Sequence, residues 1–277
     1  MSKLSVLTLT KNRTHHLQNL LEGLAQSSRL PDECIVVHMN EPAQTLGDWP
    51  FDCQHSTYKD AKEPLPLPGA RNAAANKATG DRLIFLDVDC IPAKDMLAEY
   101  DKACDRRPDA IVMGNVHYLP HKISNSWTEE TLREISEPHP KRDISNIASL
   151  EKEENYGLFW SLSFALSRDL FNQLGGFSDC YPSYGAEDTD FAWKARAQGI
   201  DLIWVPEALS FHQFHTSIVP PWHNFKSITY NAKVFYERWG EWPMEGWLKV
   251  FAEEGYIDWA LSGDRLEVLR LPAQAQS

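Results

Sequence analysis

The chain has 277 residues, of which 43% are hydrophobic and 24% charged, and its formal net charge is −12 at pH 7. A chain of this length buries about three-quarters of its unfolded surface, so it needs no disulfide or structural metal to fold. The acidic balance excludes the sequence-independent nucleic-acid binding, and the attraction to anionic membranes, that clustered Lys and Arg provide.

The cysteines and the lack of long apolar runs indicate a reducing compartment. The five cysteines are odd in number and form no CxxC pair, which is typical of free thiols. No run reaches the about 18 apolar residues of a membrane span, and the N-terminal residues lack the pattern of a signal peptide. We therefore expect a soluble, cytoplasmic protein with no transmembrane segment.

The first half of the chain alternates short apolar runs with segments of helical spacing. This pattern predicts strand 5–10, helix 14–26, strand 34–39, short strand 53–57, helix 69–79 ended by Gly80, strand 82–86, helix 94–106 and strand 110–116. Strands that are apolar throughout and alternate with helices are typical of a mostly parallel sheet covered on both faces. Ligands of such sheets bind at the carboxyl ends of the strands.

The second half begins with a polar segment of little periodicity. Residues 120–155 predict an irregular segment, and a mobile lid at 129–154 is one interpretation. The pattern then predicts an apolar run 158–166, helix 168–174 ended by Gly175 and Gly176, helix 187–198 and strand 202–205. Aromatic residues at helical spacing in 222–260 predict a C-terminal helical cap, and a platform for carbohydrate is the alternative.

Two acidic residues, Asp87 and Asp89, flank Val88 directly after the predicted strand 82–86. Mg²⁺ and Mn²⁺ bind carboxylate, phosphate and water oxygens, so two carboxylates at a strand end can hold one ion together with a diphosphate. The motif therefore predicts a clamp for a metal–diphosphate. An ordinary acidic turn after a strand is the alternative.

Three more acids, Glu187, Asp188 and Asp190, open the predicted helix 187–198. Carboxylates in the first turn of a helix are stabilised by the positive end of its dipole. Two adjacent acids also suit the removal of a proton from a hydroxyl, because one carboxylate accepts the proton while the other orients the hydroxyl. The pattern alone leaves both interpretations open.

The third motif is Phe-His-Gln-Phe-His, which contains His212 and His215. Imidazole binds divalent ions well, and a pair of buried, hydrogen-bonded histidines is the alternative. The three motifs in this order resemble glycosyltransferase family 2 of the glycosyltransferase A fold, with a β-1,4-galactosyltransferase-like C-terminal module. The resemblance covers residues 3–215 and rests on SVLTLTKNRTHHLQNLLEGL, PGARNAAANKATGDRLIFLDVDCIP and GGFSDCYPSYGAEDTDFAWKARAQG.

The resemblance implies an α/β fold: a Rossmann-like, mostly parallel sheet flanked by helices, with a C-terminal helical extension. It implies a nucleotide-sugar-binding lobe at 1–116, an acceptor and catalytic lobe at 117–215 and a helical cap at 216–277. It implies metal-dependent, inverting transfer of a galactose-, N-acetylgalactosamine- or glucose-type sugar from a UDP-sugar. The cofactor would be Mn²⁺ or Mg²⁺, and the acceptor hydroxyl would belong to a glycan, a lipid-linked or a small molecule.

The resemblance also implies roles for single residues. Asp89 and His212 would bind the metal, with His215 as the second choice, and Asp87 would contact the ribose or hold the metal through water. Asp188 would be the general base, and Glu187 would hold the acceptor. The donor would be bound by Thr8, Thr10, Asn12, Arg13, Glu41, Arg71, Asp87, Val88 and Tyr184.

The sequence departs from the family pattern at two places. Tyr184 and Ala186 stand where relatives have Trp and Gly, and Asn40 and Glu41 stand where relatives often have an Asp that binds uracil or ribose. Two other functions stay open: a degenerate member that binds nucleotide or glycan without turnover, and a nucleotidyltransferase. A nucleotidyltransferase usually has a glycine-rich loop near the N-terminus, whereas residues 11–13 of this chain contain no glycine.

Overall fold

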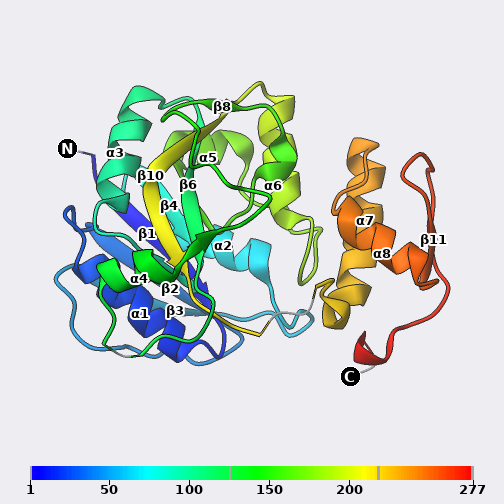
Figure 1. Ribbon diagram of the computed structural model, residues 1–277, viewed down its shortest axis with the longest axis horizontal. Coiled ribbons are helices and arrows are strands. Elements are labelled where there is room, and N and C mark those ends of the chain that lie inside the picture. Colours follow the sequence, from blue (N-terminus) through cyan, green and yellow to red (C-terminus); the bar gives the residue numbers. More distant parts are fainter. Residues whose placement is uncertain (1, 125, 217–218, 276–277) are drawn as a thin grey trace.

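The structure is a computed structural model that describes residues 2–124, 126–216 and 219–275. Within these ranges the main feature is a sheet in the order β3-β2-β1-β4-β9-β6-β10-β5, with β7 paired to β6 and β8 to β10 (Figure 1). The strands are β1 (Leu4–Thr10), β2 (Glu33–Met39), β3 (Asp52–Tyr58), β4 (Arg82–Leu86), β5 (Cys90–Pro92), β6 (Ile111–Tyr118), β7 (Glu137–Pro138), β8 (Lys152–Glu153), β9 (Ser163–Ser167) and β10 (Leu202–His212).

Parallel pairing dominates the long strands of this sheet. β3, β2, β1 and β4 pair in parallel, and so do β6 and β10. β9 runs antiparallel between β4 and β6, and β5 runs antiparallel to β10. The predicted α/β fold with a mostly parallel sheet is confirmed, and the structure adds the antiparallel strands.

Helices cover both faces of the sheet, which explains why its strands are apolar throughout. In β4, Leu83 and Phe85 belong to the core cluster that includes side chains of α2, α5 and α6, whereas Ile84 and Leu86 belong to the cluster with α1 and α3. Alternate residues of a strand point to opposite faces, so every position is buried. The helices of the sheet layers are α1 (Thr14–Ala25), α2 (Leu67–Lys77), α3 (Met96–Arg106), α4 (Glu129–Ile135), α5 (Arg168–Leu174) and α6 (Glu187–Ala197), with a 3₁₀ turn η1 (Tyr156–Leu158).

The expected role of Gly80 is wrong. Helix α2 ends at Lys77 with Ala78 as its C-cap, so Gly80 does not end the helix. A Cβ atom at Gly80 would lie 2.5 Å from Ser5 Oγ and 2.6 Å from the Lys3 carbonyl oxygen. Glycine is needed there because the chain passes close to β1 as it enters β4.

Two other segments carry more regular structure than expected. Within the segment 120–155, helix α4 begins after a capping box at Thr128. Strand β10 extends past the predicted 202–205 to His212, with a register shift against β6 between Val205 and Leu209. The longer strand carries His212 to the edge of the sheet where the parallel strands have their carboxyl ends.

The C-terminal part forms its own layer next to α6, as the orange and red ribbons in Figure 1 show. It contains the helices α7 (Phe225–Trp239) and α8 (Glu245–Glu253), the paired strands β11 (Ile257–Trp259) and β12 (Leu266–Val268), and the 3₁₀ turns η2 (Trp222–Asn224) and η3 (Ala273–Ala275). Phe225, Leu248 and Phe251 are fully buried in a separate cluster there. The expected helical extension is therefore present, together with a small second sheet.

The division into lobes at residues 116 and 215 stays a prediction. Strands from both sides of residue 116 pair within one sheet, so the two proposed lobes share that sheet. Among the described residues, the helices are too short or too polar to cross a lipid bilayer.

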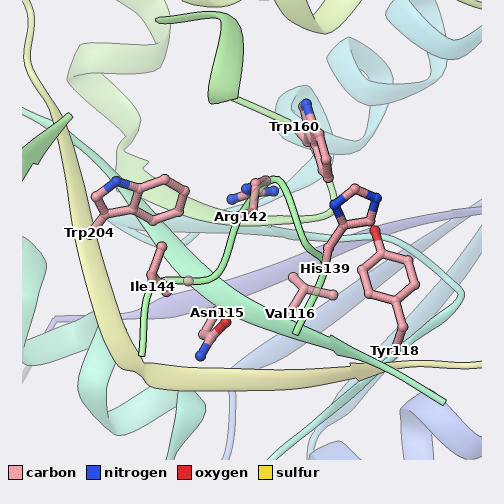
Figure 2. Close-up of a pocket in the computed structure, with 9 residues that line it drawn as sticks. Asn115, Val116, Tyr118, His139, Arg142, Ile144, Trp160 and Trp204 are labelled. Carbon is pink, nitrogen blue, oxygen red and sulfur yellow. The ribbon is translucent and has the colours of Figure 1, made fainter. Parts of the chain in front are cut away.

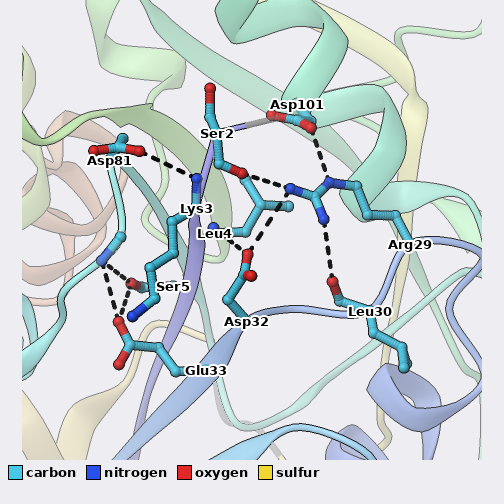
Figure 3. A network of polar contacts seen from close by, with 11 residues as sticks. Ser2, Lys3, Leu4, Ser5, Arg29, Leu30, Asp32, Glu33, Asp81 and Asp101 are labelled. Carbon is cyan, nitrogen blue, oxygen red and sulfur yellow. Dashed lines mark hydrogen bonds and ion pairs between the residues drawn. The ribbon is translucent and has the colours of Figure 1, made fainter.

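A buried carboxylate holds the amino ends of the central strands together. Glu33, the first residue of β2, is 2% exposed, and its Oε1 accepts hydrogen bonds from Ser5 Oγ (2.6 Å), Thr79 N (2.5 Å) and Gly80 N (3.1 Å). Figure 3 shows Glu33 beside Ser5 in a polar network that also includes Asp32 and Arg29. Because a buried charge is stable only when donors surround it, these bonds tie the link between α2 and β4 to β1 and β2.

We expect Glu33→Ala to lower the free energy of unfolding by about 3 kcal/mol, because it leaves several buried donors without an acceptor. Denaturant titration followed by circular dichroism measures this change. Asp52→Ala at the exposed start of β3 is the matched control, and it should change the free energy by less than about 0.5 kcal/mol. Equal losses in both variants would contradict the role given to Glu33.

Candidate active site

The motif with Asp87 and Asp89 lies at the carboxyl end of β4, in the middle of the sheet. The chain turns there, with Cys90 N donating to the Asp87 carbonyl oxygen at 2.8 Å, and continues as β5. β5 pairs antiparallel with the end of β10, which places His212 opposite Cys90. This pairing brings the acidic motif and the histidine motif, far apart in the sequence, to the same edge of the sheet.

One carboxylate and two imidazoles form a candidate metal site. Ligand atoms of Asp89, His212 and His215 all lie within 4.8 Å of one another. His215 Nε2 lies 3.4 Å from Asp89 Oδ2, so the second-choice histidine joins the first rather than replacing it. His16 Nε2 lies 3.8 Å from Asp89 Oδ1 and was not expected from the sequence. This mixed oxygen and nitrogen donor set fits Mn²⁺ better than Mg²⁺, which prefers oxygen ligands.

Burial sets the protonation of these groups. It lowers the pKa of His212 to about 3, with help from the nearby charges of His215 and Arg13, and it lowers the pKa of His16 to about 4. Both imidazoles are therefore neutral at pH 7 and have a lone pair for a metal. Burial and the neighbouring Asp87 raise the pKa of Asp89 to about 7, although the Arg13 guanidinium opposes this. A divalent cation between these groups would relieve the repulsion of the two carboxylates.

Gln213 is a residue whose role the sequence did not reveal. It is 3% exposed, and its N donates to the Asp89 carbonyl oxygen at 2.6 Å. Its Nε2 donates to the His16 carbonyl oxygen at 3.0 Å, and its Oε1 accepts from Asn19 Nδ2 at 2.7 Å. Gln213 thus connects the end of β10 to the acidic turn and to α1. The sign of this role that the sequence offered was a polar amide between the candidate ligands His212 and His215.

We expect Gln213→Ala to weaken Mn²⁺ binding by about tenfold to a hundredfold, as is usual when the residues that orient metal ligands are removed. Calorimetric titration of the protein with Mn²⁺ in the presence of UDP measures the affinity. Gln173→Ala on the exposed side of α5, whose amide bonds Gln198, is the matched control and should leave it unchanged. An unchanged affinity in Gln213→Ala would show that the acidic turn keeps its position without this amide.

The loop before α6 is held by the C-terminal layer. Asn231 of α7 is fully buried, and its Nδ2 donates to the carbonyl oxygens of Pro182 (2.9 Å) and Gly185 (2.8 Å). Ala186 has φ +68°, a left-handed conformation that favours the glycine found there in the family pattern. Helix α7 therefore positions the loop that leads into the acids of α6.

Glu187 and Arg71 form a buried ion pair that the sequence did not predict. Arg71 Nη1 lies 3.1 Å from Glu187 Oε1, and Arg71 Nη2 donates to Ser161 Oγ at 2.8 Å. The other oxygen of Glu187 accepts from Gly185 N at 3.0 Å. The expected contacts of Arg71 with the nucleotide, and of Glu187 with the acceptor, stay predictions, and both would require these bonds to rearrange or to be shared.

The other two acids of α6 differ in their surroundings. Asp190 is fully buried and accepts hydrogen bonds from Ser178 Oγ (2.6 Å) and Trp239 Nε1 (2.9 Å), so it joins α6 to α7. Asp188 accepts from Thr189 N at 2.7 Å and, among the described residues, lies within ion-pair distance of no cation. Asp188 is therefore the acid of this group whose charge is least satisfied by the protein.

The environment of Asp188 suits a general base. Burial, and next the charge of Glu187, raise its pKa to about 6, whereas Arg71 lowers it. Arg71 also lowers the pKa of Asp87, whose overall pKa is raised by burial. The guanidinium of Arg71 thus acts on a carboxylate of each acidic motif, and it pairs with Glu187, the neighbour of Asp188 in the sequence.

The predicted nucleoside contacts lie at the carboxyl ends of β1 and β2. Asn12 N donates to Glu41 Oε2 at 2.7 Å, and Glu41 Oε1 lies 3.2 Å from His38 Nδ1. These residues lie next to one another, and their contact with a nucleoside stays a prediction. Thr8 and Thr10 lie deeper in β1, at 1% and 2% exposed. Their hydroxyls therefore sit below the surface that Asn12 and Glu41 form.

Of the remaining predicted donor residues, Arg13 and Val88 lie at the acidic turn and Tyr184 lies against the C-terminal layer. Arg13 Nη1 lies 3.1 Å from Asp89 Oδ1. Val88 is buried between the two acids, at 5% exposed. The Tyr184 ring stacks on Trp247 of α8, with 6.1 Å between ring centroids. Trp247 belongs to the aromatic residues for which a cap and a carbohydrate platform were the two interpretations, and its contact with Tyr184 joins the C-terminal layer to the loop before α6.

Comparisons of the sequence agree with the motifs. Residues 5–174 match the family described as glycosyl transferase family 2, and residues 142–216 match the N-terminal domain of galactosyltransferase. The chain is 29% identical over 263 residues to an uncharacterized glycosyltransferase, YfnE, of Bacillus subtilis, covering 78% of this chain and 66% of that protein. It is 22% identical over 240 residues to chondroitin synthase of Pasteurella multocida, covering 76% of this chain and 24% of that protein. The chain thus spans between a quarter and two thirds of these relatives.

Solved structures share the fold. GalNAc-T7 with UDP, GalNAc and Mn²⁺ matches with a TM-score of 0.60 at 15% identity, covering 92% of this chain and 55% of that chain. The mannosyltransferase PcManGT of Pyrobaculum calidifontis, in complex with GDP-Man and Mn²⁺, matches with a TM-score of 0.52 at 18% identity, covering 91% and 69%. At these identities the likeness shows the fold alone, and it confirms the expected arrangement of the sheet and its helices.

Proposed function

Because the chain belongs to glycosyltransferase family 2, we propose that it transfers a sugar from a UDP-sugar to an acceptor hydroxyl with inversion, in a reaction that needs a divalent metal ion. One observation carries this proposal: the candidate ligands Asp89, His212 and His215 lie together at one edge of the sheet, and Arg71, which pairs with Glu187, acts on the pKa values of both Asp87 and Asp188. A transferase needs a site for the leaving diphosphate beside a base for the acceptor.

The donor would lie across the carboxyl ends of β1, β2 and β4. When bound by Asp89, His212 and His215, Mn²⁺ would supply positive charge that stabilises the departing nucleoside diphosphate. Arg13, which now pairs with Asp89 at 3.1 Å, is placed to pair with a phosphate instead. Asn12 and Glu41 would contact the nucleoside, and we propose a sugar of the galactose, N-acetylgalactosamine or glucose type.

Asp188 would act on the acceptor. Its carboxylate accepts the proton of the acceptor hydroxyl as the hydroxyl oxygen bonds to the anomeric carbon. The bond from that carbon to the diphosphate oxygen breaks on the opposite face, so the anomeric configuration inverts. Tyr184 and Trp247 offer aromatic faces on which the sugars of donor and acceptor can stack.

Release of nucleotide from a panel of UDP-, GDP- and dTDP-sugars, with Mn²⁺ and with a chelator, tests the proposal. We expect metal-dependent release from a UDP-sugar in the wild type, loss of release in Asp89→Ala, and unchanged release in Asp48→Ala, an exposed loop residue. Binding of a nucleotide-sugar without release in the presence of any acceptor would favour a degenerate binding protein. No metal-dependent binding of any nucleotide would contradict the proposal altogether.

A further inference from the structure

A narrow pocket lies against β6 and β10 (Figure 2). Its lining side chains leave no room for a water molecule, and they include Asn115, Tyr118, His139, Arg142, Trp160 and Trp204. The Arg142 guanidinium lies between the indole rings of Trp160 and Trp204, 4.9 Å from each centroid. The pocket is therefore built around a cation held by two aromatic rings.

Arg142 carries a charge that no carboxylate of the described residues pairs with directly. It is 7% exposed, and its Nε has no hydrogen-bond partner. Within residues 2–124, 126–216 and 219–275, its guanidinium makes no ion pair with a carboxylate. Burial lowers its pKa to about 10, so it is still protonated at neutral pH. A buried cation is normally paired, and two cation–π contacts compensate only part of its lost hydration.

Two more basic side chains accompany Arg142 in the basic loop, which we define as residues 139–142. Burial lowers the pKa of His139, and the charges of Lys141 and Arg142 lower it further. Lys141 Nζ approaches the start of α8, 4.0 Å from where a Cβ of Gly246 would lie. The carboxylate of the next residue, Asp143, accepts from Ser145 N at 3.0 Å and from its hydroxyl, and it makes no ion pair with the basic loop among the described residues.

The basic loop lies on the acceptor side of the candidate site. The predicted nucleoside contacts are at β1 and β2, whereas the pocket is at β6 and β10, the strand that ends in the candidate ligand His212. Tyr118 connects the two regions, because its ring stacks on His212 with 4.6 Å between centroids and lies 5.4 Å from His139. The charge of Asp188 also raises the pKa of Arg142.

We infer that the basic loop binds an anionic group, a carboxylate or a phosphate, that the acceptor carries close to the hydroxyl to be glycosylated. This inference rests on the proposed function. A guanidinium binds either group through parallel N–H···O bonds, and partial desolvation strengthens such bonds. Residues 139–151, all of them described, contain no helix or strand, so the basic loop and Trp160 can open the pocket without breaking regular structure.

Matched acceptors test the inference. The rate of nucleotide release is measured with methyl glucuronide against methyl glucoside, and with glycerol 3-phosphate against glycerol. We expect the wild type to prefer the anionic member of at least one pair. In Arg142→Met, kcat/KM for that member should fall by about tenfold to a hundredfold, with a smaller loss in Arg142→Lys, which keeps the charge. Arg265→Met, in the exposed link between β11 and β12, is the matched control and should keep the preference.

A direct binding measurement covers the case in which none of these acceptors is used. Trp160 and Trp204 flank Arg142, so glucuronate or inorganic phosphate should quench tryptophan fluorescence saturably in the wild type and not in Arg142→Met. No saturable quenching, or equal quenching in both proteins, would overturn the inference. So would a wild type that uses these acceptors without preferring an anionic one.

The affinity for UDP in the presence of Mn²⁺ shows whether Arg142 acts on the acceptor or on the donor. We expect Arg142→Met to bind UDP as the wild type does, within twofold, with an unchanged melting temperature for the unliganded protein. Binding of UDP weakened by about tenfold or more would assign Arg142 to the donor diphosphate and overturn the inference. If the wild type itself binds no nucleotide with metal, the proposed function fails, whatever the anion measurements show.

Discussion

Asp188→Asn is expected to lower kcat by about 10²–10⁴-fold while the affinity for UDP and Mn²⁺ stays the same, because it removes the base and keeps the shape of the side chain. Single-turnover measurement of sugar transfer gives the rate of the chemical step, and calorimetry gives the affinity. Asp188 pairs with no cation among the described residues, so the substitution leaves no buried charge unpaired. Full activity in Asp188→Asn would remove this residue from the role of base.

The pH dependence gives an independent check on Asp188. Burial raises its pKa to about 6, and the base works only when it is deprotonated. kcat/KM should therefore fall as the pH drops through about 6, by about tenfold per unit well below it, and the Asn variant should lack this descent. The matched control is Asp190→Asn, which replaces one of the two oxygens that accept from Ser178 and Trp239 and should mainly lower stability. A pH profile that is the same in the wild type and Asp188→Asn would identify another titrating group.

Asp89→Asn is expected to weaken Mn²⁺ binding by at least about 10²-fold and to lower donor turnover by a similar factor, because the site loses its one carboxylate among the clustered ligand groups. Electron paramagnetic resonance of free Mn²⁺ measures the affinity without any donor. The substitution also frees Arg13, which lies 3.1 Å from Asp89 in the structure. Repulsion between Arg13 and the metal would then add to the loss.

His212→Ala and Asp95→Asn complete this test. His212 offers a ligand atom within the 4.8 Å cluster, so its variant should also bind Mn²⁺ more weakly. Asp95 lies before α3 and accepts from Ser28 on the surface, so its variant should bind as the wild type does. Wild-type affinity in both Asp89→Asn and His212→Ala would mean that the metal, if used, binds elsewhere.

The elements that the sequence predicted best depend on local pattern. β4 and α5 have the predicted bounds, because a short apolar run and a helix closed by Gly175 are recognisable without tertiary contacts. Gly80 was misassigned because its requirement for glycine comes from Ser5 and Lys3, distant in the sequence. The antiparallel insertion of β9 between β4 and β6 has no local signature either.

In the candidate site, too, some residues are recognisable from local pattern and others only from tertiary contacts. The motifs that contain Asp89, Asp188 and His212 are visible in the sequence because they combine ionisable residues at strand and helix ends. Gln213 and Arg142 were missed, since what distinguishes them is burial and the neighbours they have or lack. The roles expected of the predicted residues stay predictions until the variants above are measured.

The sequence by itself determined the class of the fold, the order of its elements and the three motifs. Strand burial and helix amphipathicity are periodic, so both can be recognised in short stretches of sequence. Only the tertiary structure decided which motifs meet. The pairing of β5 with β10 brings His212 beside Asp89, and the Arg71–Glu187 ion pair leaves Asp188 as the unpaired acid. Distance and desolvation set the pKa values and the ligand groups, and both arise from contacts between residues far apart in the chain.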